Sequence, residues 1–230
     1  MRVAVITVGD ELLSGDTVNT NAAWLGARLE ERGATVERGV VVPDRVEDIA
    51  DVVNRCRAAY DAVLVTGGVG PTHDDVTLEG VAAAVGVPVA EHPDAVDWLE
   101  DHGEYAYADL VEGTAHLPEG SRLLENPEGV APGAVLEGDD GVPIYVLPGV
   151  PEEMQAMFGE IAGEFAGTPP TKVRIETERP ESGLIDLLAD LRERFDVTVG
   201  SYPGETVTVL IKAADPEEVE AAATWLRERL

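Results

Sequence analysis

Short apolar segments alternate with amphipathic segments from the N-terminus to Gly86, and this alternation constrains the fold more than any other feature of the chain. The apolar segments have the continuous hydrophobic character of strands that are buried on both faces. The segments between them place apolar residues at helical spacing. We predict strands at residues 3–8, 35–42 and 62–66, and helices at residues 21–31, 46–53 and 76–85. This order predicts a parallel sheet with helices on both of its faces, and therefore an α/β fold.

A break rich in Gly and Pro at residues 167–170 is the best candidate for a domain boundary. Before it, the pattern predicts helices at residues 92–101, 105–112 and 151–165, a short strand at 122–124, and a hairpin of strands 134–137 and 142–147. After it, the order strand, helix, strand, strand, helix predicts a small α+β domain. We therefore expect a large domain over residues 1–168 and a small βαββα domain over residues 169–230.

The chain is strongly acidic, with 45 Asp and Glu against 16 Lys and Arg and a formal net charge of −29. Nucleic acids and anionic membrane surfaces are excluded as partners, because binding to them needs a basic surface. A hydrophobic fraction of 44% argues against an acidic disordered chain. Lysine occurs only as Lys172 and Lys212. This composition is typical of a halophilic protein, since at molar salt the Debye length of about 3 Å screens surface repulsion.

Three further features bear on where the protein works. No run of about 18 apolar residues occurs, so we expect no membrane-spanning helix. The apolar N-terminal segment is too short for a signal peptide and has the pattern of a strand. Cys56 is the single cysteine, which excludes an intrachain disulfide. We expect a soluble, cytoplasmic protein.

A glycine-rich loop follows the third predicted strand directly and carries the strongest local signal. Its sequence is Thr66-Gly67-Gly68-Val69-Gly70-Pro71-Thr72-His73-Asp74-Asp75-Val76-Thr77. Glycines let backbone N–H groups approach an anion, and a helix N-terminus after the loop would add partial positive charge. The loop is no P-loop because it has no lysine, and no dinucleotide fingerprint because His73 stands where a third glycine is needed. It indicates a phosphate-binding loop of another type.

Further motifs follow the other strands: residues 9–15 with residues 19–21, Pro43-Asp44, and residues 147–154. Ligands of open α/β sheets bind beyond the carboxyl ends of the strands, where these segments should meet. That edge would gather carboxylates: Asp10, Glu11, Asp44, Asp74 and Asp75. No Lys or Arg occurs in residues 9–21 or in the glycine loop, so backbone dipoles, His73 or a metal ion would neutralise a bound anion. Oxygen ligands favour Mg²⁺, with Mn²⁺ and Co²⁺ as alternatives and K⁺ as a further candidate.

Five ordered motifs together resemble the molybdopterin-binding superfamily of the MoaB/Mog type. Within it, the chain is most similar to the N-terminal domain of CinA competence/damage-inducible proteins and their short archaeal relatives. The motifs that carry the resemblance are residues 9–15, 19–25, 66–77, 126–133 and 147–154, and the tail from Lys172 resembles the small domain that follows in CinA-like chains. The resemblance implies a three-layer α/β/α domain with a mixed, mostly parallel sheet. It also implies dimers or trimers.

The family implies two chemistries, adenylylation of molybdopterin and metal-dependent cleavage of ADP-ribose or related dinucleotides such as FAD. Asp44 and Asp75 match functional aspartates of the adenylyltransferases. Two positions depart from the family pattern. Asn19 stands where CinA proteins usually have Asp, which removes one carboxylate from a metal site. Asp74 stands near a position where the adenylyltransferases carry Arg, which weakens the case for adenylylation.

Our leading hypothesis is a metal-dependent hydrolase of a nucleotide pyrophosphate. The candidate catalytic residues are Asp75, Asp44 and Asp10, and the candidate metal ligands are Asp10, Asp74 and Asp75. The candidate ligand-binding residues are Gly9, Glu11, Ser14, Asn19, Asn21, Thr66, Gly67, Gly68, Gly70, Pro71, Thr72, Thr77, Pro148 and Gly149. Two alternatives stay open: a molybdopterin-binding or adenylylating protein, and a non-catalytic domain that binds a nucleotide or pterin.

Overall fold

The computed structural model describes residues 1–70, 72, 74–102, 111 and 113–230. Pro71 and His73, and all of the helix predicted at 105–112 except residue 111, lie outside the described residues. The chain forms two compact units, residues 1–167 and 168–230.

The first unit is built on a six-stranded sheet in the order β2-β1-β3-β8-β7-β6. Strands β1, β2, β3 and β8 are parallel to one another, and β7 runs antiparallel between β8 and β6. The strands are β1 (Arg2–Val8), β2 (Thr35–Val42), β3 (Ala62–Thr66), β6 (Arg122–Leu124), β7 (Gly133–Glu137) and β8 (Pro143–Leu147). The predicted α/β class with a mainly parallel sheet is confirmed, and so is the predicted hairpin, which forms β7 and β8.

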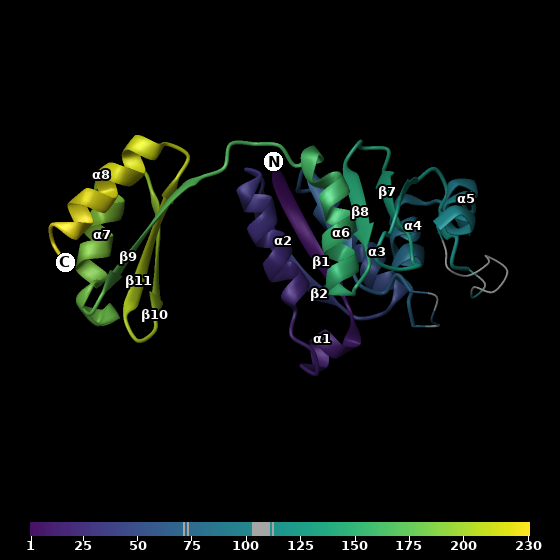
Figure 1. Ribbon diagram of the computed structural model, residues 1–230, viewed down its shortest axis with the longest axis horizontal. Helices are drawn as coiled ribbons and strands as arrows, with labels where there is room; N and C mark the ends of the chain where they lie inside the picture. The colour runs from purple at the N-terminus through teal and green to yellow at the C-terminus, as the bar shows by residue number, and fades with distance from the viewer. Residues whose placement is uncertain (71, 73, 103–110, 112) are drawn as a thin grey trace. The chain divides into compact units, whose positions relative to one another are not determined.

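Helices cover both faces of this sheet (Figure 1). Side chains along β1 point alternately to the two faces of the sheet, so both faces are apolar and both need covering. Val3 and Val5 belong to one hydrophobic core, and Ala4 and Ile6 belong to the other. The core of Val3 and Val5 includes residues of α2 and α6, and the core of Ala4 and Ile6 includes residues of α3, α4 and α5. The helices are α1 (Asp10–Ser14), α2 (Thr20–Glu31), α3 (Val46–Arg57), α4 (Thr77–Val85), α5 (Pro93–His102) and α6 (Pro151–Ile161), and the 3₁₀ turn η2 (Ala162–Glu164) follows α6.

Two features of this unit, a small two-stranded sheet and a short helix, have no counterpart among the sequence predictions. Strands β4 (Val89–Glu91) and β5 (His116–Pro118) pair antiparallel as a separate two-stranded sheet. Helix α1 is a single short helix directly after β1. Both are too short to show a hydrophobic period, which is the signal from which the other elements were predicted.

The second unit has a three-stranded antiparallel sheet in the order β10-β11-β9. Its core gathers residues from all three strands and from both helices, including Ile175, Leu188 and Val219. The predicted helix from Ser182 is divided into a 3₁₀ turn and an α-helix that begins at Ile185. The elements are β9 (Thr171–Thr177), η3 (Glu181–Gly183), α7 (Ile185–Arg194), β10 (Thr198–Pro203), β11 (Val207–Ala213) and α8 (Pro216–Arg227).

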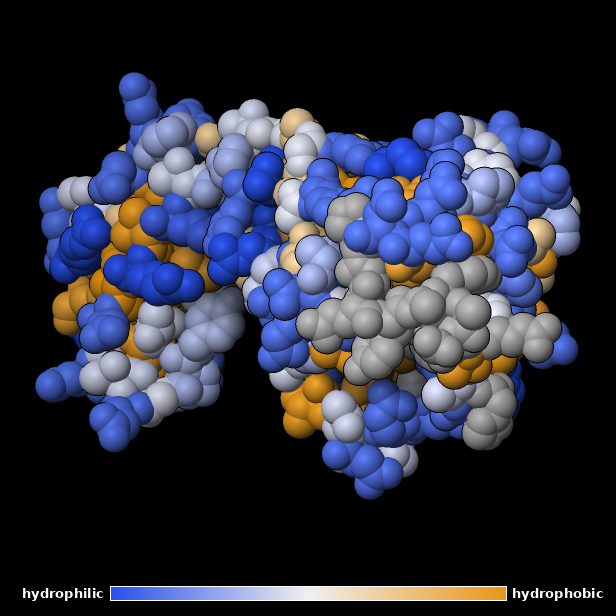
Figure 2. Space-filling view, turned by 45° about the vertical axis from the view of Figure 1, so that its right-hand side comes forward, coloured by the Kyte–Doolittle hydropathy of each residue, from blue (hydrophilic) through white to orange (hydrophobic). Residues whose placement is uncertain are grey.

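The surface in Figure 2 is mostly hydrophilic, with hydrophobic residues in scattered patches. This agrees with a chain in which 27% of residues are charged. Within the ranges that the structure describes, no helix is both long enough and apolar enough to cross a bilayer.

Candidate functional site

The loops that follow the four parallel strands meet at one edge of the sheet. The register shows this, because Val8 lies opposite Val42 on β2, while Thr7 lies opposite Thr66 on β3. Thr66 in turn lies opposite Leu147 on β8. The four strands therefore end at nearly the same level, and the polar segments after them face a common space, as the sequence predicted.

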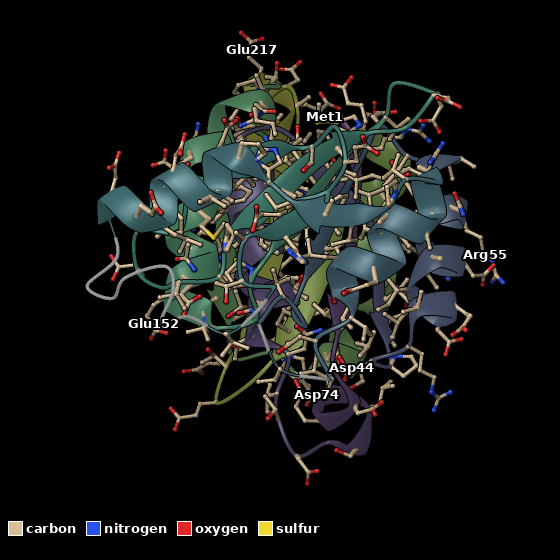
Figure 3. All side chains as sticks on the ribbon, turned by 90° about the vertical axis from the view of Figure 1, so that its right-hand side faces the viewer. Met1, Asp44, Arg55, Asp74, Glu152 and Glu217 are labelled. Carbon is tan, nitrogen blue, oxygen red and sulfur yellow. The ribbon has the colours of Figure 1, made fainter. Side chains whose placement is uncertain are left out.

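That space is a cavity of about 270 Å³, called the strand-end cavity below. The glycine loop, the segment after β1, Asp44 and the turn after β8 all contribute to its wall. The predicted site residues that line it are Gly9, Glu11, Asn19, Asn21, Asp44, Thr66, Gly67, Gly68, Asp74, Asp75 and Gly149. Asp44 and Asp74 lie close together beside α1 in Figure 3.

Three buried threonines tie the loops of the cavity together. The side chain of Thr66 donates a hydrogen bond to the carbonyl of Pro148 at 2.7 Å. The Thr77 hydroxyl donates to the carbonyl of Gly67, also at 2.7 Å. The hydroxyl of Thr7 accepts from the Asn19 side chain at 2.8 Å. Each threonine is at most 2% exposed, so these bonds are shielded from water and hold the loops in fixed positions.

The backbone of the glycine loop is confined to conformations that favour glycine. Gly67 and Gly68 have φ angles of 100° and 61°. The Thr77 amide donates to the Gly68 carbonyl at 3.0 Å, so the first N–H of α4 is used within the loop. The N-terminus of α4, which the sequence predicted as part of an anion site, therefore already donates one of its N–H groups to the loop. Among the described residues, none accepts a hydrogen bond from the amides of Gly68, Val69 or Gly70.

Four carboxylates line the cavity: Glu11, Asp44, Asp74 and Asp75. Its lining includes no Lys or Arg within the described part of the chain. Burial raises the pKa of Asp44, and the negative charges of Asp10, Glu11 and Asp74 raise it further. A hydrogen bond from the Asp10 amide to Asp44 Oδ2, at 2.8 Å, opposes that rise. The cavity thus concentrates negative charge around one carboxyl that resists ionisation.

Asp44→Asn is expected to raise the melting temperature at pH 7 by about 1–2 °C, a shift suited to a partly exposed group in a domain of this size. A raised pKa means that the folded state disfavours the ionised carboxylate. Wild-type stability is therefore highest below the ordinary pKa of the carboxyl and is lost as the pH rises through the raised pKa. The asparagine oxygen can still accept from the Asp10 amide. Scanning calorimetry should show the difference shrinking between pH 7 and pH 4, whereas a destabilised variant at pH 7 would disprove this account of Asp44.

The structure does not bring every predicted residue into the cavity wall. Asp10 contributes its backbone N–H to Asp44, and its side chain is not part of the wall. Ser14 donates to Asp16 at 2.7 Å instead of facing the cavity. Gly70 and Thr72 line an adjoining hollow, and the Thr72 side chain donates to the Asp75 carboxylate. Thr77 and Pro148 act through the hydrogen bonds given above. Pro71 lies outside the described residues.

The two asparagines of the segment after β1 have different roles. Asn19 caps α2, because its side-chain oxygen accepts from the Ala22 amide at 3.1 Å while its Nδ2 donates to Thr7. Asn21 donates to the Gly149 carbonyl at 2.8 Å. Its Oδ1 is buried and has no hydrogen-bond partner in the described structure. A buried polar atom of this kind at a cavity wall is a natural contact for a ligand donor or a cation.

Sequence reasoning missed several residues of the wall, among them Thr7, Thr17 and Val18. Thr7 could have been found, because it is a polar residue near the end of a buried strand. Thr66, which was predicted as a site residue, lies opposite it at the end of β3. Thr17 and Val18 lie between two motifs that were recognised, but neither has a residue type that indicates a site.

Oxygen donors in the cavity are of the kind that a hard divalent cation prefers. Among the residues that the structure describes, however, no three His, Cys, Asp or Glu side chains are grouped so that they could hold a metal ion. Mg²⁺ is commonly bound by one or two carboxylates together with substrate phosphates and water, so a complete protein cage is not required. The two wall carboxylates that would hold such an ion are Asp74 and Asp75, both of them metal ligands predicted from the sequence.

Comparisons with known proteins identify relatives of both units. The model of a family described as "Probable molybdopterin binding domain" matches residues 4–167. A protein of Aeropyrum pernix is 52% identical over 160 residues, which are 68% of this chain and 59% of that protein. A CinA-like protein of Salinibacter ruber is 36% identical over 234 residues, which are 97% of this chain and 57% of that protein. The crystal structure of the protein CinA from Thermoplasma acidophilum aligns with a TM-score of 0.67 and 38% identity, covering 71% of this chain and 97% of that one.

Proposed function

Because this chain belongs to the CinA-type, MoaB/Mog-like family of molybdopterin-binding domains, we propose that its strand-end cavity binds a small nucleotide and hydrolyses its pyrophosphate bond. One observation carries the proposal: the backbone of Gly67 and Gly68 and three aspartates, Asp44, Asp74 and Asp75, line the same small cavity. A glycine backbone can approach phosphate closely, and carboxylates can direct water.

Phosphate binding in this cavity depends on the backbone and not on basic side chains. The amide of Gly68, in the wall of the cavity, supplies one donor, and the amides of Val69 and Gly70 supply further donors where the loop lines the adjoining hollow, as in other backbone anion sites. The Oδ1 of Asn21 needs a donor, which a ribose hydroxyl or a bound water would provide. The carboxylates repel phosphate unless a cation lies between them, so ligand binding should depend on divalent metal.

The hydrolytic step needs a base for the attacking water. The new bond forms between the water oxygen and one phosphorus, the bridging P–O bond breaks, and the water proton passes to a carboxylate. Asp44 is the best candidate for this proton, because its raised pKa makes it a stronger base than an ordinary aspartate. A divalent ion, when bound, would supply neutralisation of phosphate charge and activation of water. With ADP-ribose the products would be AMP and ribose 5-phosphate.

The proposal is tested by incubating the protein with ADP-ribose or FAD and Mg²⁺ or Co²⁺ in concentrated KCl. Chromatography should detect AMP, and chelation with EDTA should reduce its release by about 100-fold or more if the ion activates the water. Adding back the metal should restore the rate. Absence of AMP under all of these conditions would rule out the hydrolase.

A second function is binding of a nucleotide or pterin without turnover. It is favoured by the structural hydrogen bonds that the Asn19 side chain makes. The resemblance to CinA proteins implies an Asp at this position, whereas the Asn19 side chain caps α2 and donates a hydrogen bond to Thr7. The family description, "Probable molybdopterin binding domain", is consistent with a carried pterin. Calorimetry that shows tight binding, together with chromatography that shows no product, would select this function over hydrolysis.

A further inference from the structure

A separate hollow of about 280 Å³ lies between α3 and β2, the edge strand of the six-stranded sheet. We call it the edge hollow. Its volume is close to the lower end of the range of ligand pockets, about 300–1,000 Å³, so it suits a small molecule. Within the described ranges it shares no residue with the strand-end cavity, and the proposed function does not use it. Its lining residues are Arg38, Val40, Val52, Arg55, Cys56, Ala59 and Tyr60.

The edge hollow has an apolar floor because α3 extends over the edge of the sheet. Among the described strands, β2 pairs only with β1, so no strand lies beyond it. The spacing of Val52, Cys56 and Ala59 places these side chains on one stripe that begins on α3 and continues past its last residue. Arg38 and Val40 lie two apart on β2 and share a face, which is the face of Cys56, because Val40 packs against the core that includes Cys56.

Arg38 is the charged group of this hollow that has no acidic partner. Among the described residues, none forms an ion pair or a hydrogen bond with its side chain, although the chain has 45 acidic and only 16 basic residues. Arg55, in contrast, donates from Nε to Asp51 Oδ1 at 3.1 Å and lies at the periphery of the molecule in Figure 3. Burial raises the pKa of the Cys56 thiol, and the positive charge of Arg38 opposes that rise, so this charge acts across the floor of the hollow.

Tyr60 supplies a second polar group beside the same floor. Its ring packs partly buried against the core, and its amide donates to the Cys56 carbonyl at 2.9 Å, which ties it to the end of α3. Within the described part of the chain, its hydroxyl has no hydrogen-bond partner. The edge hollow therefore combines one guanidinium and one hydroxyl donor with apolar surface.

We propose that the edge hollow binds a small monocarboxylate with an apolar body, held by Arg38 and by the Tyr60 hydroxyl. A guanidinium matches the two oxygens of a carboxylate, and the apolar body removes the floor from water. A single guanidinium without a partner favours a singly charged head, because a phosphate dianion would leave one charge uncompensated near Asp51. The contact suits concentrated salt, since a charge-assisted hydrogen bond of about 2.8 Å is no longer than the Debye length of about 3 Å.

A protective role of Arg38 is the competing explanation. Charged side chains on an edge strand prevent it from pairing with another chain. Such a role requires neither a hollow nor a hydroxyl beside the charge, and it predicts no preference between ligands. A second copy of this chain seated on β2 is the other possible occupant of the hollow.

The test titrates benzoate and its neutral analogue benzamide into protein labelled with ¹³C at Ala and Val methyl groups, followed by NMR in concentrated KCl. Benzoate should shift the signals of Val40, Val52 and Ala59, and it should bind about tenfold or more tightly than benzamide, the usual scale for a hydrogen bond to a charged group. Arg38→Met keeps an apolar stem and should reduce that ratio to about one. The matched control is Arg32→Met, which loses the same charge from an exposed residue outside the hollow and should leave the ratio unchanged. Equal melting temperatures would show that both variants are folded.

Benzoate that shifts none of these signals, equal affinities for benzoate and benzamide in wild type, or an unchanged ratio in R38M would overturn the inference. Tighter binding of phenyl phosphate than of benzoate would overturn the choice of a monocarboxylate. Sedimentation velocity that shows a wild-type dimer and an R38M monomer would assign the hollow to a second copy and would also overturn the inference. None of these readouts depends on hydrolysis in the strand-end cavity.

Discussion

Gly67→Ala is expected to lower the free energy of unfolding of residues 1–167 by about 3 kcal/mol or more. Gly67 has a φ of 100°, which an L-residue adopts only under strain. A Cβ at this position would fall within 3.0 Å of the Val8 carbonyl oxygen. Val8 is fixed in the sheet by its pairing with β2, so the backbone cannot move away without breaking the site. Denaturation by urea, followed by circular dichroism, measures the loss.

The matched control for this change is Gly26→Ala. Gly26 lies within α2, and a Cβ there would meet no atom within 4 Å. Alanine is the better helix former by about 1 kcal/mol, so G26A should stabilise the same unit. A G67A protein as stable as wild type would show that the close approach of the glycine loop to β1 is not present in solution.

The sheet and the location of the site follow from local patterns, which explains why they could be predicted. Residues 3–8 and 62–66 have the apolar continuity of buried strands, and parallel strands must present their carboxyl ends at one edge. The strand pattern therefore predicts that Asp44, Asp74, Asp75 and the glycine loop lie at one site. The family predicted from the motifs is confirmed by the family model that matches residues 4–167.

The hydrogen bonds of individual side chains could not be predicted, because they depend on contacts between distant segments. Asp10 contributes its amide to Asp44, which is 34 residues away. Glu153 is oriented by Asn126 across 27 residues. Neither pairing corresponds to a hydrophobic period or a motif spacing in the sequence. The role of Asn19 as the N-cap of α2 likewise follows from the structure and not from the sequence.

Asp44→Asn is expected to reduce the rate of nucleotide hydrolysis by about 100-fold or more, the usual cost of removing a general base. The variant keeps the size of the side chain and an oxygen for the Asp10 amide, but it cannot take a proton from water. Because the same change should raise stability at neutral pH, a loss of activity would not result from unfolding. A gain in stability with a loss of activity is typical of a residue retained for function.

The control for this variant is Asp16→Asn. Asp16 is an exposed carboxylate that accepts a hydrogen bond from Ser14 and is not part of the cavity wall. D16N removes the same charge from the segment after β1, so it reports any effect of net charge alone. Its rate should stay within about twofold of wild type, since a surface charge far from the reacting atoms contributes little in concentrated salt.

The most direct measurement is therefore the initial rate of AMP release from ADP-ribose by wild type, D44N and D16N, at pH 7 with Mg²⁺ or Co²⁺ in concentrated KCl. A site in the strand-end cavity requires wild type and D16N to release AMP at similar rates and D44N to be at least about 100-fold slower. D44N that releases AMP as fast as wild type, or a wild type that releases none, would contradict the assignment of nucleotide hydrolysis to this cavity.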